Sequence, residues 1–176
     1  NTRVPEMLEA DLDSEIEAIR MGARRMEELF RRFGAETVEA CFQAILDKCR
    51  YIYANELLPK IPDGEYAWED YVEHDGVTDP KLHKLALKMT KRDGRITLDF
   101  TGTDPQSEGP INYYLNEHLL KMFIGVYLIM THDPWILFND GFYPLVDIHI
   151  PEGSLLKPHH PAALSCRTHL LGRQFD

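Results

Sequence analysis

Residues 85–100 read Leu-Ala-Leu-Lys-Met-Thr-Lys-Arg-Asp-Gly-Arg-Ile-Thr-Leu-Asp-Phe, and they carry the clearest structural pattern in the chain. Apolar side chains alternate on both sides of Asp93-Gly94, at Leu85, Leu87 and Met89 before it and at Ile96, Leu98 and Phe100 after it. A period of two is typical of a β-strand with one buried face. An Asp-Gly pair between two such runs suits a two-residue turn with positive φ angles, so the stretch predicts a β-hairpin.

Further elements surround this hairpin. Tyr66, Trp68 and Val72 alternate and predict a preceding strand. Residues 142–150 predict a later strand that contains Pro144, which we expect at an edge or a bulge. Residues 116–130 predict a helix that is apolar on most of its surface, so it must be covered by the sheet and by other parts of the protein. Together they predict an α+β fold in which an antiparallel β-hairpin and sheet pack on one buried apolar helix.

The first 60 residues have a helical pattern instead. Residues 5–33 place apolar side chains three, four or seven positions apart, and Gly34 is a stop signal. A second helix follows and ends before Pro59. A connection of about three residues predicts an antiparallel αα-hairpin. We therefore divide the chain into a helical hairpin at 1–60 and an α+β segment at 61–176.

Composition excludes several classes of protein. The 176 residues include 19 basic and 29 acidic side chains, for a formal net charge of −10, which argues against binding to nucleic acid or to anionic lipid. The most apolar run, residues 119–130, is too short to cross a bilayer. The odd number of cysteines, Cys41, Cys49 and Cys166, suggests a reducing compartment and thus a cytoplasmic protein.

The end of the hairpin is the candidate site. In Asp99-Phe100-Thr101-Gly102-Thr103-Asp104, alternation turns Phe100 inward and places Asp99 and Thr101 on the opposite face. Carboxylates and hydroxyls around a glycine could bind a cation or a polar substrate, so Asp99, Thr101 and Asp104 are the catalytic candidates. The alternative is a structural turn, since Asp, Thr and Gly are favoured there through bonds to local backbone.

Other reactive side chains have weaker patterns. None of the eight histidines has H-x-x-x-H or zinc-finger spacing, although Asp147 and His149 share a strand face and could share a ligand. Asn139-Asp140-Gly141 is first a turn signal, and Cys166 could be a reactive thiol or a buried apolar residue. The chain has neither of the glycine-rich phosphate-binding motifs, so we expect no nucleotide site in it.

The order of several short motifs resembles a known family. Residues 97–106, Asn139-Asp140-Gly141-Phe142-Tyr143 and residues 150–158, which contain Pro151-Glu152-Gly153, are similar to the B-type subunits of the hydantoinase and oxoprolinase superfamily. Within it, three segments look most like the large α subunit of acetone carboxylase: residues 68–77, 110–114 and 155–167. Hydantoinase B subunits share the Asp-Phe-(Ser/Thr)-Gly-Thr core and the Pro-Glu-Gly strand end.

The resemblance implies a part of a larger assembly. Superfamily members pair a B-type subunit with an ATP-splitting hydantoinase A-like subunit, and acetone carboxylases add a small third subunit. In acetone carboxylases ATP is cleaved to AMP and phosphate, and acetone and bicarbonate become acetoacetate at an α subunit that holds Mn²⁺. No manganese ligand can be transferred to a residue of this sequence. We therefore expect no cofactor in this chain itself, with ATP and Mn²⁺ bound elsewhere in the complex.

Three functions stay open. The first is part of the α subunit of an ATP-dependent acetone carboxylase-like complex, and the second is part of the B-type subunit of a hydantoinase or 5-oxoprolinase that hydrolyses a cyclic amide. The third is a non-catalytic assembly module of such a subunit. Because the chain opens on Asn1 and family subunits are several times longer, we expect an internal fragment that is inactive alone.

Overall fold

The computed structural model describes residues 4–77, 81–132, 134–136 and 138–164. The chain divides into two compact units, and the boundary between them falls after Ile45. The boundary lies inside a helix, so the first part of that helix belongs to one unit and its end belongs to the other. The domain limit at residue 60 stays a prediction.

The first unit consists of one whole helix and the first part of the next. Helix α1 (Pro5–Phe33) has Glu6 in its first turn and two arginines in its last, which suits the helix dipole. It ends at Gly34, whose φ of 81° favours glycine, and α2 (Ala35–Ile52) begins at the next residue. The connection is therefore one residue rather than about three. None of the residues of α1 is buried.

The end of α2 joins the second unit. It continues into a π-helical turn, η1 (Tyr53–Leu57), and a 3-10 turn, η2 (Leu58–Lys60). The buried Tyr53 hydroxyl donates to the carbonyl of Gly125 at 2.7 Å, and its ring stacks on Phe142 at 4.2 Å between centroids. These contacts tie the segment before the sheet to elements far along the chain.

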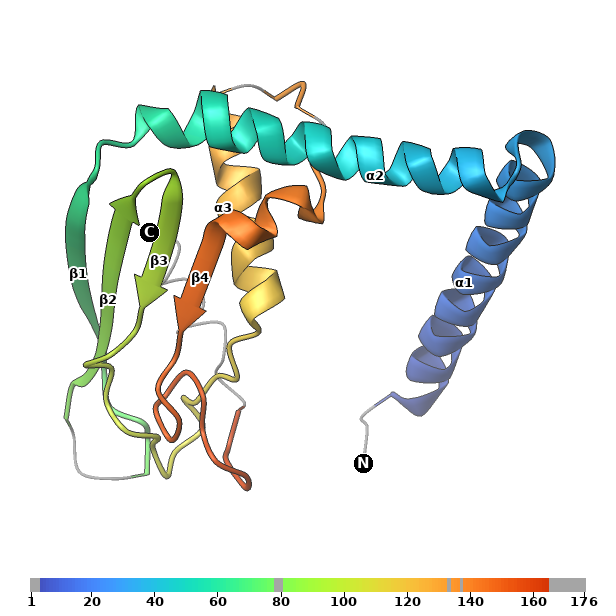
Figure 1. The fold of residues 1–176 in the computed structure, drawn as a ribbon. Coiled ribbons are helices and arrows are strands. Elements are labelled where there is room, and N and C mark those ends of the chain that lie inside the picture. Colours follow the sequence, from blue (N-terminus) through green and yellow to red (C-terminus); the bar gives the residue numbers. More distant parts are fainter. Residues whose placement is uncertain (1–3, 78–80, 133, 137, 165–176) are drawn as a thin grey trace. The chain divides into compact units, whose positions relative to one another are not determined.

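The sheet of the second unit has four strands in the order β1 (Gly64–Val72), β2 (His83–Arg92), β3 (Arg95–Asp99) and β4 (Val146–His149) (Figure 1). The predicted hairpin is confirmed as β2 and β3, which pair antiparallel with Arg92 opposite Arg95. Asp93 and Gly94 have φ angles of 51° and 71°, as the tight turn requires.

Strand β4 adds a parallel pair to the antiparallel sheet. It pairs with β3 from Ile96 opposite Val146 to Asp99 opposite His149. Parallel neighbours need a long crossover connection, and here it contains the predicted apolar helix, α3 (Glu117–His132). The Asn116 side chain accepts a hydrogen bond from the backbone N–H of Leu119 and caps the helix. The α+β fold is therefore confirmed.

The prediction of a strand at residues 142–150 is wrong for residues 142–145. Residues Asp140–Leu145 form a 3-10 helix, η3, and the strand covers only Val146–His149. The side-chain oxygen of Asn139 accepts from Gly141 N at 2.8 Å and starts the turn. Pro144 has no N–H to give to a ladder, so the chain pairs with β3 only after it.

Apolar side chains of the sheet, α3, η1 and η3 build the core of this unit. Leu85, Ile96, Leu98, Leu120 and Phe142 are all buried in it. Within the described residues, no helix is both long and apolar enough to span a membrane.

Candidate functional site

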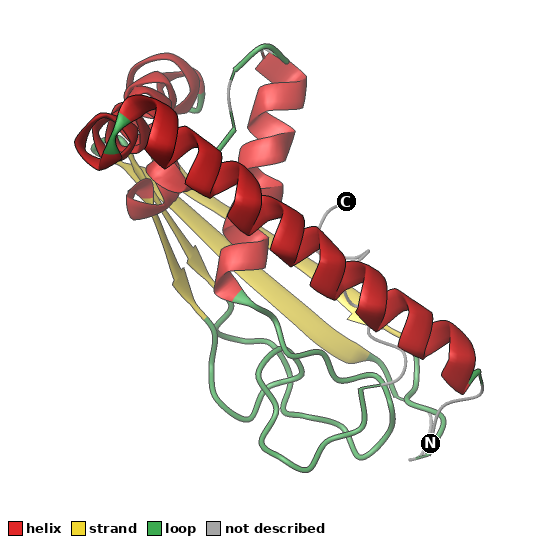
Figure 2. Cartoon of the chain, turned by 90° about the vertical axis from the view of Figure 1, so that its right-hand side faces the viewer, coloured by secondary structure: helices red, strands yellow, loops and turns green. Residues whose placement is uncertain are grey.

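The loops that carry the candidate residues gather at one end of the sheet. Strand β1 ends there, β2 begins there, and β3 and β4 both end there, because β3 is antiparallel to β2 and parallel to β4. Figure 2 shows the long loops at this end. We call it the loop end, formed by residues 73–77, 100–116 and 150–164 together with His83 at the start of β2.

Asp99 and Thr101 form a local turn at the end of β3. The Asp99 carboxylate accepts from the backbone N–H of Thr101 at 2.9 Å. A side-chain hydrogen bond with Thr101 holds the pKa of Asp99 below its ordinary value, with smaller contributions from His149 and Lys88. Thr101 is exposed and Phe100 is buried, as the alternation predicted. The pair has the bonds of an Asx turn.

Thr103 and Asp104 form hydrogen bonds to the backbone of the first residues of β2. The Asp104 carboxylate accepts from Lys84 N at 3.0 Å, while Asp104 N donates to the Lys84 carbonyl at 3.0 Å. The Thr103 hydroxyl accepts from Ala86 N at 3.1 Å and lies 3.2 Å from the Ala86 carbonyl. Each side chain thus replaces the ladder partner that β2 would have if β3 continued, and both hold the loop against the sheet.

The three catalytic candidates do not converge on one point. Asp99 lies opposite Lys88 in the β2–β3 ladder, whereas Asp104 pairs with Lys84. Four residues of an extended strand separate those positions, which is roughly 13 Å at about 3.3 Å per residue. The structure brings Asp99 and Thr101 together and places Asp104 apart from them. Their catalytic role stays a prediction.

A buried polar cluster joins the three loops of the loop end. Asp75 is 3% exposed and accepts from the Ser107 hydroxyl and, at 3.3 Å, from Gly109 N. Asn112 is fully buried, accepts from Ser107 N at 2.8 Å, and donates to the carbonyls of Ser107, Gly109 and Ala163. A Cβ on Gly109 would lie 2.5 Å from Asp75, so the loop fits only glycine there.

His83 lies at the same end and is the least satisfied polar side chain there. It is 1% exposed, and neither ring nitrogen has a hydrogen-bond partner among the residues that the structure describes. Burial lowers the pKa of the imidazole and Lys81 lowers it further, against smaller opposite effects of Asp75 and Asp104. Burial therefore favours the neutral form of the ring.

The other candidates from the sequence have contacts of their own. Asp147 pairs with Arg95 at 2.8 Å, and His149 lies beside Asp99 in the ladder. Both are exposed on one face of β4, and a ligand shared between them stays a prediction. The backbone of His159 is tied to the Gln106 side chain, whose oxygen accepts from His159 N at 2.6 Å. Cys166 lies outside the described residues. Within those residues, no group of three or more His, Cys, Asp or Glu side chains is placed to hold a metal ion.

Sequence reasoning missed the cluster of Asp75, Ser107 and Asn112 and the burial of His83. The chain separates Asp75 from Ser107 by 32 positions, so no local spacing links them. Two stretches of sequence could have pointed to the cluster. Asp75-Gly76 follows an alternating strand and by itself indicates only a loop. Pro110-Ile111-Asn112 is by itself only one of the motifs that carry the family resemblance. His83 precedes the alternating run and has no pattern of its own.

Comparison with known proteins identifies the family. The hydantoinase B/oxoprolinase family model matches residues 1–176. The B-type subunit of a putative D-/L-hydantoinase from Pseudomonas sp. (strain NS671) is 31% identical over 178 residues, which cover 95% of this chain and 29% of that protein.

Two solved structures have a similar fold. The ATP-dependent caprolactamase from Pseudomonas jessenii matches with a TM-score of 0.76 and 26% identity, over 92% of this chain and 27% of that one. The nucleotide-free acetone carboxylase matches with a TM-score of 0.70 and 20% identity, over 85% and 21%. The chain spans less than a third of the length of each of these relatives. From the match over its whole length, this chain belongs to the hydantoinase B/oxoprolinase family.

Proposed function

We propose that this chain is part of the B-type subunit of an ATP-dependent enzyme complex that acts on a small carbonyl compound. The family match over all 176 residues carries this proposal. The similar proteins include a hydantoinase subunit, an ATP-dependent caprolactamase and an acetone carboxylase. The two candidate substrate classes are therefore cyclic amides and ketones.

The first candidate is hydrolysis of a cyclic amide. It is supported by the identity of 31% to the B-type subunit of a putative hydantoinase and of 26% to the caprolactamase structure, both of them named for cyclic amides. Opening such a ring is unfavourable without an energy source when the ring is stable. Coupling to ATP in a partner subunit would supply it, with ADP and phosphate as the expected products.

The second candidate is carboxylation of a ketone such as acetone, with bicarbonate as co-substrate. It is supported by the resemblance of residues 68–77, 110–114 and 155–167 to the acetone carboxylase α subunit. An enolate and a carboxyl donor must then meet away from water beside a Lewis acid, for which the resemblance implies Mn²⁺. ATP would be cleaved to AMP.

We propose that the described residues of this chain act as framework in either reaction. Asp99 and Asp104 use carboxylate oxygens on backbone N–H groups, and Asp75 and Asn112 bind the loops to one another. ATP and Mn²⁺ would be bound by the partner subunit and by other parts of the B-type subunit. This role is that of the assembly module, the third of the functions that the sequence leaves open.

The nucleotide product separates the two reactions. The complex that contains this chain is incubated with ATP, in one tube with hydantoin or a lactam and in another with acetone and bicarbonate. ADP formed only with the cyclic amide supports the first candidate, and AMP formed only with acetone and bicarbonate supports the second. ATP cleavage that neither substrate stimulates contradicts the proposal.

A further inference from the structure

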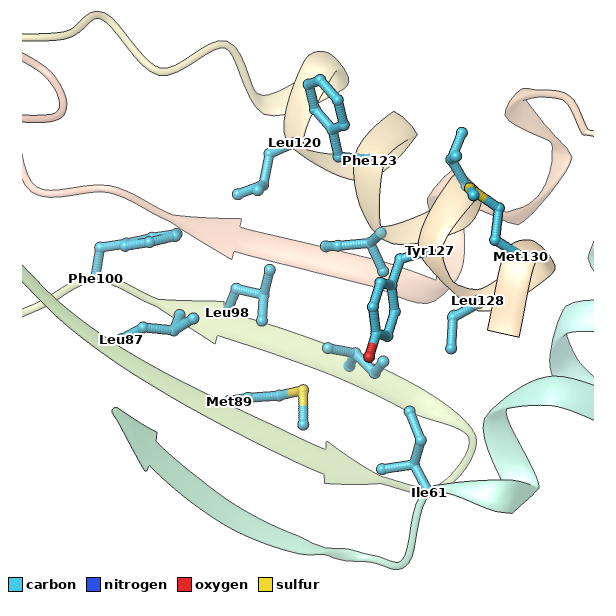
Figure 3. Close-up of a pocket in the computed structure, with 13 residues that line it drawn as sticks. Ile61, Leu87, Met89, Leu98, Phe100, Leu120, Phe123, Tyr127, Leu128 and Met130 are labelled. Carbon is cyan, nitrogen blue, oxygen red and sulfur yellow. The ribbon is translucent and has the colours of Figure 1, made fainter. Parts of the chain in front are cut away.

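An apolar groove lies between the sheet and α3. It has a volume of about 680 Å³ and is lined by side chains from β2, β3 and α3 together with Ile61 and Phe100. Figure 3 shows Leu87, Met89 and Leu98 on the sheet facing Leu120 and Tyr127 on the helix. Every one of these residues belongs to the second unit, so the groove is a feature of one compact body.

The lining of the groove does not suit a small polar molecule. Ligand sites of roughly 300–1,000 Å³ are mostly apolar but carry a few convergent polar groups that orient the ligand. Here none of the lining residues is charged, and the Tyr127 hydroxyl is the single polar side-chain group among them. Hydantoins, lactams and bicarbonate would lose their hydrogen bonds to water in such a groove without replacing them.

The lining does suit the side chains of another protein segment. The exposed fractions of Tyr127 and Met130 are 67% and 75%, and both residues line the groove. Aromatic residues and methionine are enriched, and charged residues depleted, at the centres of protein interfaces. An almost wholly apolar lining matches an obligate contact, which resembles a domain core cut in half, better than a transient one.

We propose that the groove is filled by an apolar segment of the same B-type subunit, from the part of that polypeptide that lies outside residues 1–176. The inference rests on the proposed function, because it takes this chain as part of a family subunit. In the relatives, the matched region is 29% of one protein and 27% of another, so more than twice its length lies elsewhere in the same polypeptide.

Placing a segment of the same polypeptide here is also the least costly way to cover the groove. Leu87, Met89 and Phe123 are already half-buried at its walls, and filling the groove would remove their remaining apolar surface from water, which stabilises the folded protein. A segment linked to this chain loses less association entropy than a separate partner does. The groove would then be part of the core of the whole subunit.

Photo-crosslinking in the full-length subunit, purified in its complex, tests this inference. Tyr127→p-benzoylphenylalanine keeps an aromatic side chain at the rim of the groove, and mass spectrometry identifies the crosslinked peptide. We expect a peptide of the same polypeptide from outside residues 1–176. Crosslinks confined to residues 1–176, to a partner subunit or to a second copy distinguished by isotope labelling would overturn the proposal.

Tyr71→p-benzoylphenylalanine is the matched control, because Tyr71 lies on the face of the sheet that points away from the groove. Tyr66 pairs with Met89, which lines the groove, so Tyr66 shares the face of the groove. Tyr71 is five residues further along β1 and therefore lies on the opposite face. It should not crosslink to the peptide found with the Tyr127 variant, and a shared peptide would contradict the groove as its site. Neither readout needs turnover, so a failure of the proposed reaction leaves the result intact.

Thiol protection gives an independent measurement if the aromatic replacement prevents folding. A Met89→Cys thiol should react with a maleimide at least 100-fold more slowly in the native subunit than in urea, with or without the partner subunits. Reaction at the rate seen in urea, or protection that requires a partner subunit, would overturn the proposal.

Discussion

Polar side chains at the loop end bond chiefly to backbone groups of neighbouring loops. Asp104 accepts from Lys84 N, Thr103 from Ala86 N, and Asn112 donates to three carbonyls. A buried backbone group without a partner costs about as much as a lost hydrogen bond, so these side chains stabilise loops that cannot form a ladder. Aspartate and threonine side chains that suggested catalysis in the sequence therefore also hold the loops in place through hydrogen bonds.

Asn112→Ala should therefore destabilise the protein strongly. The change removes four hydrogen bonds at a fully buried position and leaves backbone groups of Ser107, Gly109 and Ala163 without that partner. We expect a loss of about 3 kcal/mol in the free energy of unfolding, measured by urea denaturation. Asn55→Ala, which removes an exposed bond to Tyr51, should cost under about 0.5 kcal/mol. Equal effects of the two changes would contradict the assignment.

His83 should make stability depend on pH. Its pKa is lower in the folded protein than in the unfolded chain, so the unfolded state binds more protons as the pH falls below about 6.5. The contribution of the neutral His83 ring to the free energy of unfolding is fully present above that pH. It decreases as the pH falls towards the pKa of His83 in the folded protein, and it does not change further below that pKa. His83→Phe removes the titrating group.

The urea midpoint measured from pH 8 to pH 5 checks this prediction. The wild-type protein should lose stability over that range more steeply than His83→Phe does. His149→Phe is a control, since His149 is exposed on β4, and it should keep the wild-type slope. A wild-type slope in the His83 variant would show that another group causes the dependence.

Among the elements, those with local signals could be predicted from the sequence. The β2–β3 hairpin depends on Asp93-Gly94 and two alternating runs, and α3 depends on a continuous apolar stretch with Asn116 at its start. The parallel pairing of β4 with β3 depends on contacts about 50 residues apart, which no local pattern encodes. The alternation in residues 142–150 was overridden by Pro144 and the Asn139 cap.

Substitutions of two glycines test the backbone conformations of the β2–β3 turn and of α1. Gly94→Ala puts a Cβ on a residue with a φ of 71° and should destabilise the hairpin by about 1 kcal/mol. Gly22→Ala lies inside α1 with nothing within 4 Å of the new Cβ, so it should stabilise that helix by about 1 kcal/mol. Circular dichroism during urea unfolding measures both. A neutral effect of Gly94→Ala would contradict the strain assigned to the turn.

For the whole molecule, the family could be inferred from short motifs, whereas the candidate site could not be completed. Asp99 and Thr101 do meet, but their separation from Asp104 depends on the register of β2 and β3, which the sequence does not encode directly. The sequence predicts the groove beside α3 only as an apolar helix surface in need of cover. The chain matches less than a third of each relative, and an apolar groove lies between the sheet and α3.

If Asp99, Thr101 and Asp104 are framework within an ATP-dependent complex, as we propose, their side chains are not needed for turnover. The direct measurement is substrate-dependent ATP turnover by the full complex carrying Asp99→Ala and Thr101→Ala together, with Asp104→Ala in a second preparation. We predict turnover within about twofold of the wild type in both, and a lower melting temperature for Asp104→Ala because the bond to Lys84 N is lost. A loss of 100-fold or more in a double variant that assembles normally would contradict the claim and place Asp99 and Thr101 in the active site.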